Sequence, residues 1–283
     1  MGTLRNNRRT TFQGMGLSLG TALSCLFAMA VLLSPVLAQA KGPMPYKSGE
    51  RLTYDVHVMG SYAGKGVLSV GEPRRYKGKK VVPLVGELVS EEFWKNVYPV
   101  NDRILSLIGK SLAPVRTEMQ IREKKLNKDV VIKYNGKRNL ATGTKRKGKR
   151  PAKAFKKRVP KKTQDMLSWL FRIRLLDFEN KNTFALTGFS GNFVYDIRIK
   201  VDGKQLIWTK LGEKEGYVLK TTVTRRGGRK PFKKLATFWI GTDEERTPLK
   251  LAVDMPVGHV EAFLSEVSRK VSPSKTAAMA KTP

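Results

Sequence analysis

The chain has 283 residues, and 55 Lys and Arg residues against 23 Asp and Glu residues give it a formal net charge of +32. Its single cysteine, Cys25, lies in an apolar N-terminal stretch. The rest of the chain therefore has no disulfide, no thiol nucleophile and no cysteine metal ligand. Its stability must come from an apolar core, for which about 240 residues are ample.

The first forty residues have the order of a secretory signal peptide. A basic segment at residues 5–9 precedes a largely apolar, uncharged stretch at residues 14–38, which ends in the small residues Ala38-Gln39-Ala40. We expect cleavage after Ala40, a mature N-terminus at Lys41, and export to the periplasm. The alternative is an uncleaved membrane anchor, because the apolar stretch is long enough to span about 30 Å of hydrocarbon as a helix.

Alternation of apolar and polar residues is the commonest pattern after residue 49. Leu52, Tyr54, Val56 and Val58 take every second position, which is the period of a strand with one buried face. Asp202-Gly203, between two such runs, is interpreted as a hairpin turn. The predicted strands cover residues 52–58, 67–70, 81–89, 100–108, 115–121, 129–134, 193–201, 204–209, 216–223, 236–240, 248–253 and 259–265.

One segment, residues 164–176, has apolar residues at the three- and four-residue spacing of a helix. Thr163 is its predicted N-cap, and Asp165 in the first turn complements the helix dipole. Because apolar residues occupy more than one face, the helix is expected to be largely buried against the sheet.

These elements predict a mainly β fold, in which antiparallel strands form an open barrel or wrapped sheet with one packed helix. The expected organisation is a signal peptide at residues 1–40, one β domain at residues 46–268, and a disordered tail at residues 269–283. The domain carries a basic insert at residues 137–162, interpreted as a mobile loop or poorly ordered strand extension because it has too few apolar side chains to fold alone.

The insert belongs to a stretch, residues 130–164, with 14 basic and no acidic residues. It could bind an anionic lipid or cell-wall polymer, or nucleic acid, or it could be a solvated surface without a partner. Nucleic acid is disfavoured because the insert has only Phe155 for base stacking, and membrane contact is expected to be peripheral. The predicted ligand-binding residues are Lys145, Arg146, Lys147, Lys149, Arg150, Lys156, Lys157 and Arg158.

Several motifs together resemble a known family. They are Gly49-Glu50-Arg51-Leu52-Thr53-Tyr54-Asp55-Val56, Tyr98-Pro99-Val100-Asn101-Asp102-Arg103, Gln164-Asp165-Met166-Leu167-Ser168, and Phe238-Trp239-Ile240-Gly241-Thr242-Asp243-Glu244-Glu245-Arg246-Thr247-Pro248-Leu249. In order and spacing they resemble the bacterial exported proteins grouped as the domain of unknown function DUF3108. The resemblance implies an exported, mostly antiparallel β-protein and brings no established activity or catalytic residue. The departures are the basic insert and Gly241-Thr242, where a serine and an acidic residue are expected.

Residues 243–246 form the tightest charged cluster. We interpret Asp243, Glu244 and Arg246 as a structural polar turn between two strands, with Arg246 pairing with a carboxylate. The alternative is a pair of carboxylates for acid–base chemistry, as in glycoside cleavage.

No catalytic residue, metal site or cofactor is predicted. The two histidines, His57 and His259, are far apart in sequence, whereas a metal site needs three or four convergent ligands. Asp165 and Ser168 could be a nucleophile and its partner, but no glycine elbow surrounds Ser168. A buried helix start explains both residues more simply.

The sequence thus predicts a periplasmic binding or scaffold protein of the bacterial cell envelope that engages an anionic lipid or cell-wall polymer. The alternative is a cell-wall glycan hydrolase that uses Asp243 and Glu244. An enzyme should show a cleft with convergent carboxylates, whereas a binding protein should show an apolar groove or a uniform basic face. The sequence does not indicate an oligomeric state.

Overall fold

The computed structural model describes residues 46–227 and 232–269. The predicted signal peptide and its cleavage site lie outside the described residues, as does all but the first residue of the predicted tail. Within these ranges no helix has the length and apolar character needed to cross a membrane.

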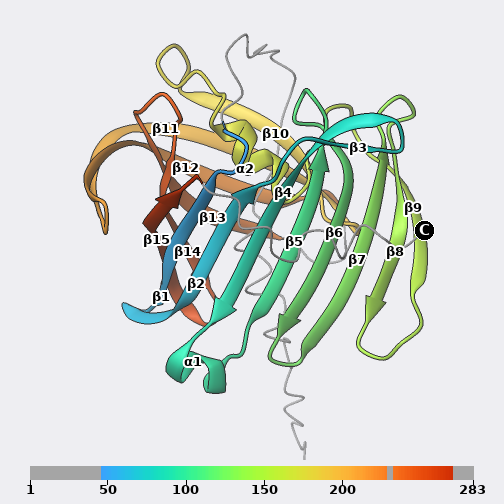
Figure 1. Ribbon diagram of the computed structural model, residues 1–283, viewed down its shortest axis with the longest axis horizontal. Coiled ribbons are helices and arrows are strands. Elements are labelled where there is room, and N and C mark those ends of the chain that lie inside the picture. Colours follow the sequence, from blue (N-terminus) through green and yellow to red (C-terminus); the bar gives the residue numbers. More distant parts are fainter. Residues whose placement is uncertain (1–45, 228–231, 270–283) are drawn as a thin grey trace, which may run out of the picture.

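The described residues form a single antiparallel sheet of 15 strands with two short helices, α1 (Glu92–Val97) and α2 (Ser168–Ile173) (Figure 1). The strand order is β10-β11-β12-β13-β14-β15-β1-β2-β4-β5-β6-β7-β8-β9, and β3 pairs with β4 off this path. The strands are β1 (Arg51–Val58), β2 (Ser61–Val70), β3 (Arg74–Tyr76), β4 (Lys79–Ser90), β5 (Asn101–Ile108), β6 (Pro114–Glu123), β7 (Leu126–Asn135), β8 (Leu140–Lys147), β9 (Lys153–Arg158), β10 (Thr183–Phe189), β11 (Val194–Thr209), β12 (Gly212–Arg225), β13 (Lys233–Gly241), β14 (Pro248–Met255) and β15 (Gly258–Ser268).

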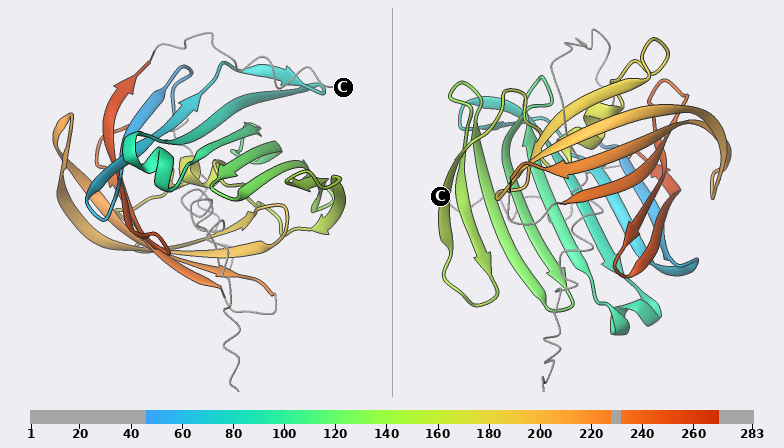
Figure 2. Two further views of the ribbon diagram at one scale, coloured as in Figure 1. Left: turned by 90° about the horizontal axis from the view of Figure 1, so that it is seen from below. Right: turned by 180° about the vertical axis from the view of Figure 1, so that it is seen from behind.

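The sheet curves back on itself without closing (Figure 2). Its middle is the pairing of the first strand with the last, from Arg51 opposite Ser268 to Val58 opposite Val260. The edge strands β9 and β10 are not paired with each other, although the Phe155 and Phe189 rings lie 6.2 Å apart across them. The predicted mainly β fold with an open or wrapped sheet and a packed helix is confirmed.

The core lies on the inner side of the wrapped sheet. Alternate residues of the strands are completely buried there, including Leu52, Ile132 and Ile197. Helix α2 packs on this inner side, where the ring of Trp169 meets the ring of Phe238 edge-on at 5.3 Å. The predicted burial of the helix is therefore confirmed.

The helix is shorter than expected, because only Ser168–Ile173 are helical. The predicted N-cap at Thr163 is wrong, since the Thr163 hydroxyl donates to the Pro160 carbonyl instead. Gln164 forms an isolated parallel bridge with Gly188 of β10. The first turn that the apolar spacing predicted is therefore not helical, because Gln164 pairs with the sheet instead.

The hairpin predicted at Asp202-Gly203 is also wrong. Strand β11 runs continuously through these residues, and a register shift against β12 between Val201 and Lys204 marks a bulge. Gly203 has a φ of +92°, so the bulge uses the same backbone freedom that a tight turn would use. The chain reverses only after Thr209, where Lys210 and Leu211 join β11 to β12.

The basic insert is not a loop. Strands β8 and β9 form a hairpin that extends the sheet beyond β7, and β8 pairs with β7 from Lys128 opposite Lys147 to Asn135 opposite Leu140. Few apolar residues are needed, because β7 already supplies the buried neighbours: Ala141 is completely buried. Of the two interpretations the mobile loop is wrong, and the strand extension is closer, because the segment adds two strands to an existing sheet. Strands β3 and β10 and helix α1 were not predicted from the sequence.

Candidate functional site

One end of the wrapped sheet gathers helix α1 and several turns, and we call it the α1 rim. It comprises the β1–β2 turn at Met59, helix α1, the β6–β7 turn at Lys124 and Lys125, and the β8–β9 turn at residues 148–152 (Figure 1, lower end). Backbone bonds tie neighbouring turns together: Met59 N–H donates to the His259 carbonyl at 2.8 Å, and Lys124 N–H donates to the Pro99 carbonyl at 2.8 Å.

The α1 rim exposes apolar side chains. Met59 is 71% exposed, Phe93 67% and Val97 41%, and helix α1 buries none of its residues. Tyr62 anchors the start of this helix by donating to the Glu91 carboxylate at 2.7 Å. Exposed apolar side chains that cluster at one place indicate an interaction surface.

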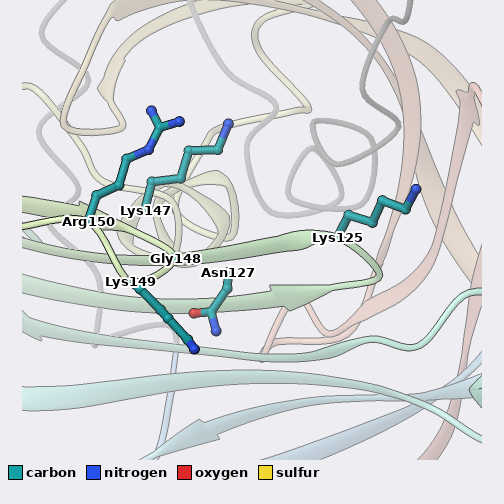
Figure 3. A pocket seen from close by; sticks show the side chains of 6 residues that line it. All are labelled: Lys125, Asn127, Lys147, Gly148, Lys149 and Arg150. Carbon is teal, nitrogen blue, oxygen red and sulfur yellow. The ribbon is translucent and has the colours of Figure 1, made fainter.

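The same rim carries an open basic pocket between the β6–β7 and β8–β9 turns (Figure 3). Among the described residues, its four cations make no ion pair. Figure 3 shows the side chains of Lys147 and Arg150 pointing to the same side of the hairpin, and Lys149 pointing away from them. The lining residues are Lys125, Asn127, Lys147, Gly148, Lys149 and Arg150.

The structure places the eight predicted basic residues in four different environments. Lys147, Lys149 and Arg150 lie at the α1 rim. The Lys145 ammonium donates to the Asn192 side chain at 3.0 Å. Burial lowers the pKa of Lys145, and the nearby Lys147 charge lowers it further. Arg146 pairs with Asp129 at 2.5 Å on the outer face of the sheet. The remaining three are exposed on the edge strand β9: Lys156, Lys157 and Arg158.

Two apolar cavities lie on the inner side of the sheet. The first, which we call the α2 cavity, has about 70 Å³ of free space and is partly open to solvent. It is lined by Tyr54, Val56, Gly66, Val67, Leu68, Leu88, Leu170, Ile173, Phe238, Ile240, Pro248, Lys250, Leu251 and Ala262. No acidic side chain is among them.

The second, which we call the α1 cavity, lies behind the α1 rim, has about 30 Å³ of free space and is also partly open. Its only side-chain hydrogen-bonding groups are those of Ser90, Trp94 and Tyr98. It is lined by Val56, Val58, Ala63, Gly64, Leu88, Val89, Ser90, Trp94, Tyr98, Val100, Val257 and Val260.

The opposite end of the sheet is held by a buried ion pair. The Arg174 guanidinium, just after α2, donates to both oxygens of the Glu50 carboxylate at 2.6 and 3.1 Å. It also donates to the Glu245 carbonyl at 2.9 Å. This bidentate geometry compensates the burial of both charges. The role of Arg174 was not predictable from local sequence, because its partner lies 124 residues away.

Asp165 organises the start of α2 and is not part of a nucleophilic site. Its buried carboxylate accepts hydrogen bonds from the Ser106 and Thr117 hydroxyls and from the backbone N–H of Leu167 and Ser168. The Ser168 hydroxyl oxygen in turn accepts from the Asp165 N–H at 2.9 Å. Ser168 is completely buried, so its hydroxyl belongs to a reciprocal helix cap.

The acidic cluster lies where a turn was predicted, between β13 and β14. The Asp243 carboxylate accepts from the Thr247 N–H at 3.0 Å, and Glu244 is exposed. Arg246 lies 3.5 Å from the Glu179 carboxylate and 4.7 Å over the Tyr217 ring. Asp243 and Glu244 line neither apolar cavity nor the basic pocket.

A buried pair of acids near the α1 rim was not predicted. Asp102 on β5 and Glu123 on β6 are each only 1% exposed, and Asp102 accepts from the Arg122 N–H at 2.6 Å. Burial raises the pKa of Asp102 to about 6, although the Arg122 N–H and the contact with Glu123 oppose this rise. Such a pair can share a proton near neutral pH.

Within residues 46–227 and 232–269, no three His, Cys, Asp or Glu side chains are placed to hold a metal ion. His259 lies 2.7 Å from the Asp254 carboxylate, and His57 packs edge-on against Tyr62 and Phe263. The two predicted isolated histidines thus have separate local partners.

An open, wrapped antiparallel sheet with a helix packed inside one end defines a barrel-like β-protein. The family described as "Protein of unknown function (DUF3108)" matches residues 53–265, and the chain belongs to this family. The resemblance inferred from the sequence motifs is therefore confirmed. The comparison with curated proteins finds no match.

One solved structure shows the same kind of fold. A beta-barrel-like protein of the domain of unknown function DUF1849 from Brucella abortus superposes with a TM-score of 0.53 at 12% identity, covering 78% of this chain and 98% of that one. A protein with a YmcC-like fold from Bacteroides fragilis gives a TM-score of 0.37 at 8% identity, covering 80% and 98%. At these identities the likeness of the first shows the fold alone, and that of the second supports no conclusion.

Proposed function

We propose that the protein is exported to the periplasm and binds the surface of an anionic membrane through its α1 rim. The observation that carries this proposal is the coincidence, at one end of the sheet, of unpaired cations and exposed apolar side chains. Each basic residue held near an anionic lipid surface contributes about 1 kcal/mol. The exposed apolar side chains add burial in the interfacial region of the bilayer.

The apolar part of the rim favours lipid over a cell-wall polymer. Met59, Phe93 and Val97 would remain exposed against a hydrated glycan, whereas a bilayer offers hydrocarbon to cover them. Their exposure together with the neighbouring basic pocket fits peripheral contact. The glycan hydrolase alternative has less support, because Asp243 is engaged in a turn and Glu244 is exposed on it.

The test compares charges at the two ends of the molecule. One variant replaces Lys147, Lys149 and Arg150 by Gln. A control variant with the same net charge replaces Lys161, Lys162 and Lys181, three exposed cations at the α2 end. The length of β8 places the two ends about 25 Å apart, beyond the Debye length of about 10 Å at 0.1 M salt.

We expect the exported protein to co-sediment with phosphatidylglycerol-containing vesicles at low salt and to be released at high salt. The rim variant should lose about 3 kcal/mol of membrane affinity, or roughly a hundredfold, and the control variant much less. Equal binding to zwitterionic vesicles, or equal losses in the two variants, would contradict the proposal.

A further inference from the structure

Strand β9 forms a free edge of the sheet. It is the last strand in the strand order, and among the described residues no other strand pairs with its outer side (Figure 1, right). The Phe155 ring holds β9 in place by packing 6.2 Å from the Phe189 ring. Gly143 lies opposite Phe155 and leaves room for this ring, since a Cβ built on Gly143 would be 2.9 Å from it. A free edge that is held in place offers backbone N–H and carbonyl groups to an additional strand.

Alternate residues of β9 direct their backbone groups away from β8. The Val159 N–H donates at 2.9 Å to the carbonyl of Asn139, which directly precedes β8. The register between β8 and β9 is continuous. Because the backbone groups of successive residues in a strand point to opposite edges, those of Lys157 face β8. The residues whose backbone groups point outward are Ala154, Lys156 and Arg158.

The free edge carries a concentrated positive charge. Four of the six residues of β9 are exposed cations, and none of them makes an ion pair with another described residue. These cations are Lys153, Lys156, Lys157 and Arg158. Such an edge would attract a negatively charged strand and repel a positively charged one.

The charge also argues against two strands that the protein itself could supply. A second copy of β9 would place four cations against four cations, so pairing between two copies is opposed. Residues 269–283 of the same chain contain four Lys and Arg residues and no Asp or Glu. They do not complement the free edge either, which leaves an acidic segment of another protein.

From this edge we propose that β9 binds an extended, acidic peptide segment of another protein, which adds to the sheet as a further strand. The segment pairs with the outward N–H and carbonyl groups of β9, and its carboxylates lie beside the exposed cations. Backbone pairing supplies affinity, and the cations select an acidic sequence. The inference is independent of membrane contact at the α1 rim.

The test uses two variants of Lys156 that have the same charge. Lys156→Pro removes the outward N–H, whereas Lys156→Gln keeps it. Neither should break the pairing of β8 with β9, because β8 does not use this N–H, and proline is tolerated at such edge positions. The probe is a fluorescein-labelled synthetic peptide of alternating glutamate and threonine. A second form of the peptide is N-methylated at alternate residues, so that it has the same charge and cannot donate from one edge.

We expect the unmethylated peptide to bind the exported protein saturably, as measured by fluorescence anisotropy. Lys156→Gln should weaken this binding about threefold, because one exposed charge is lost. Lys156→Pro should weaken it about thirtyfold or more, because backbone pairing is also lost. The methylated peptide should bind the parent chain at least about tenfold more weakly than the unmethylated one. Circular dichroism checks that both variants fold, and if Lys156→Pro does not, the two peptides still provide the comparison.

Three results would overturn the inference. Equal binding of the two folded variants, or of the two peptides, means attraction by charge alone. Absence of saturable peptide binding means that the edge takes no acidic strand. Sedimentation of Lys156→Gln with anionic vesicles tests the other class of partner. A loss of vesicle binding without any peptide binding would assign β9 to the membrane surface instead.

Discussion

Helices α1 and α2 have the same length and the same aromatic content, but they lie in opposite environments. Each has six residues with one Phe and one Trp. In α2, Trp169 and Phe171 are buried on the inner side of the sheet. In α1, no residue is buried, and Phe93 is 67% exposed.

The surroundings explain this difference. The α2 end supplies partners for its charged groups: Glu50 for Arg174, and Ser106 and Thr117 for Asp165. The α1 end keeps several cations without an ion pair among the described residues. Paired, buried charges indicate a structural role, whereas exposed apolar surface beside unpaired cations indicates contact with another molecule.

The largest effect is expected for Phe171→Ala. Truncation of a buried Phe removes its packing and leaves a cavity, which costs about 3–5 kcal/mol. The Phe171 ring is 2% exposed and meets Tyr46 edge-on at 5.7 Å. Urea denaturation should show a lower midpoint with an unchanged slope. A loss below about 1 kcal/mol would mean that α2 does not anchor this end of the sheet.

The contrast between the helices also shows what the sequence could predict. The burial of α2 follows from local spacing, because apolar residues occupy several faces of one short segment. The α1 rim cannot be found this way, because Met59, Phe93, Lys125 and Arg150 are brought together only by the strand order. The one local signal was Lys124-Lys125 in a tight turn between two strands.

Long-range strand pairing also determines how the basic stretch folds and which of its charges are neutralised. Its charge was evident from the sequence, but its fold was not, because β8 and β9 depend on β7 for buried neighbours. Arg146 looked equivalent to Lys147, yet the hairpin register places it beside Asp129, which neutralises it. The sequence could therefore indicate a basic surface without showing which of its residues remain available.

An intermediate effect, of opposite sign, is expected for Asp102→Asn near the α1 rim. Burial raises the Asp102 pKa to about 6, above the value of about 3.9 in an unfolded chain. The folded state therefore binds more protons between about pH 4 and 6, and its stability falls as the pH rises through this window. Above about pH 6 the ionised, buried carboxylate opposes folding by roughly 1–3 kcal/mol.

Asparagine keeps the oxygen that accepts from the Arg122 N–H and cannot ionise. Asp102→Asn should thus be more stable than the parent chain at pH 7, and the gain should vanish near pH 4. Asp129→Asn is the control, and its expected change in stability has the opposite sign. Burial would raise the pKa of Asp129, but hydrogen bonds from Arg122 and Arg146 outweigh burial and lower this pKa. That variant should be less stable at pH 7, and its loss should diminish as the pH falls. Thermal unfolding of the two variants at several pH values would measure these changes in stability. A parallel pH dependence for the two variants would contradict the raised pKa of Asp102.

The smallest effect on stability is expected for Phe93→Ala, the counterpart of Phe171→Ala on the other helix. An exposed ring contributes little to the core, so the free energy of unfolding should change by no more than about 0.5 kcal/mol. Binding to anionic vesicles should nevertheless weaken, because the ring would insert into the bilayer interface. This loss of affinity should depend less on salt than the loss caused by replacing Lys147, Lys149 and Arg150, because only the charges are screened. Equilibrium unfolding and vesicle sedimentation of the same variant measure the two properties separately. If Phe93→Ala destabilises the chain as much as Phe171→Ala, α1 is part of the core; if it changes neither property, the exposed apolar surface of the rim has no role in membrane contact.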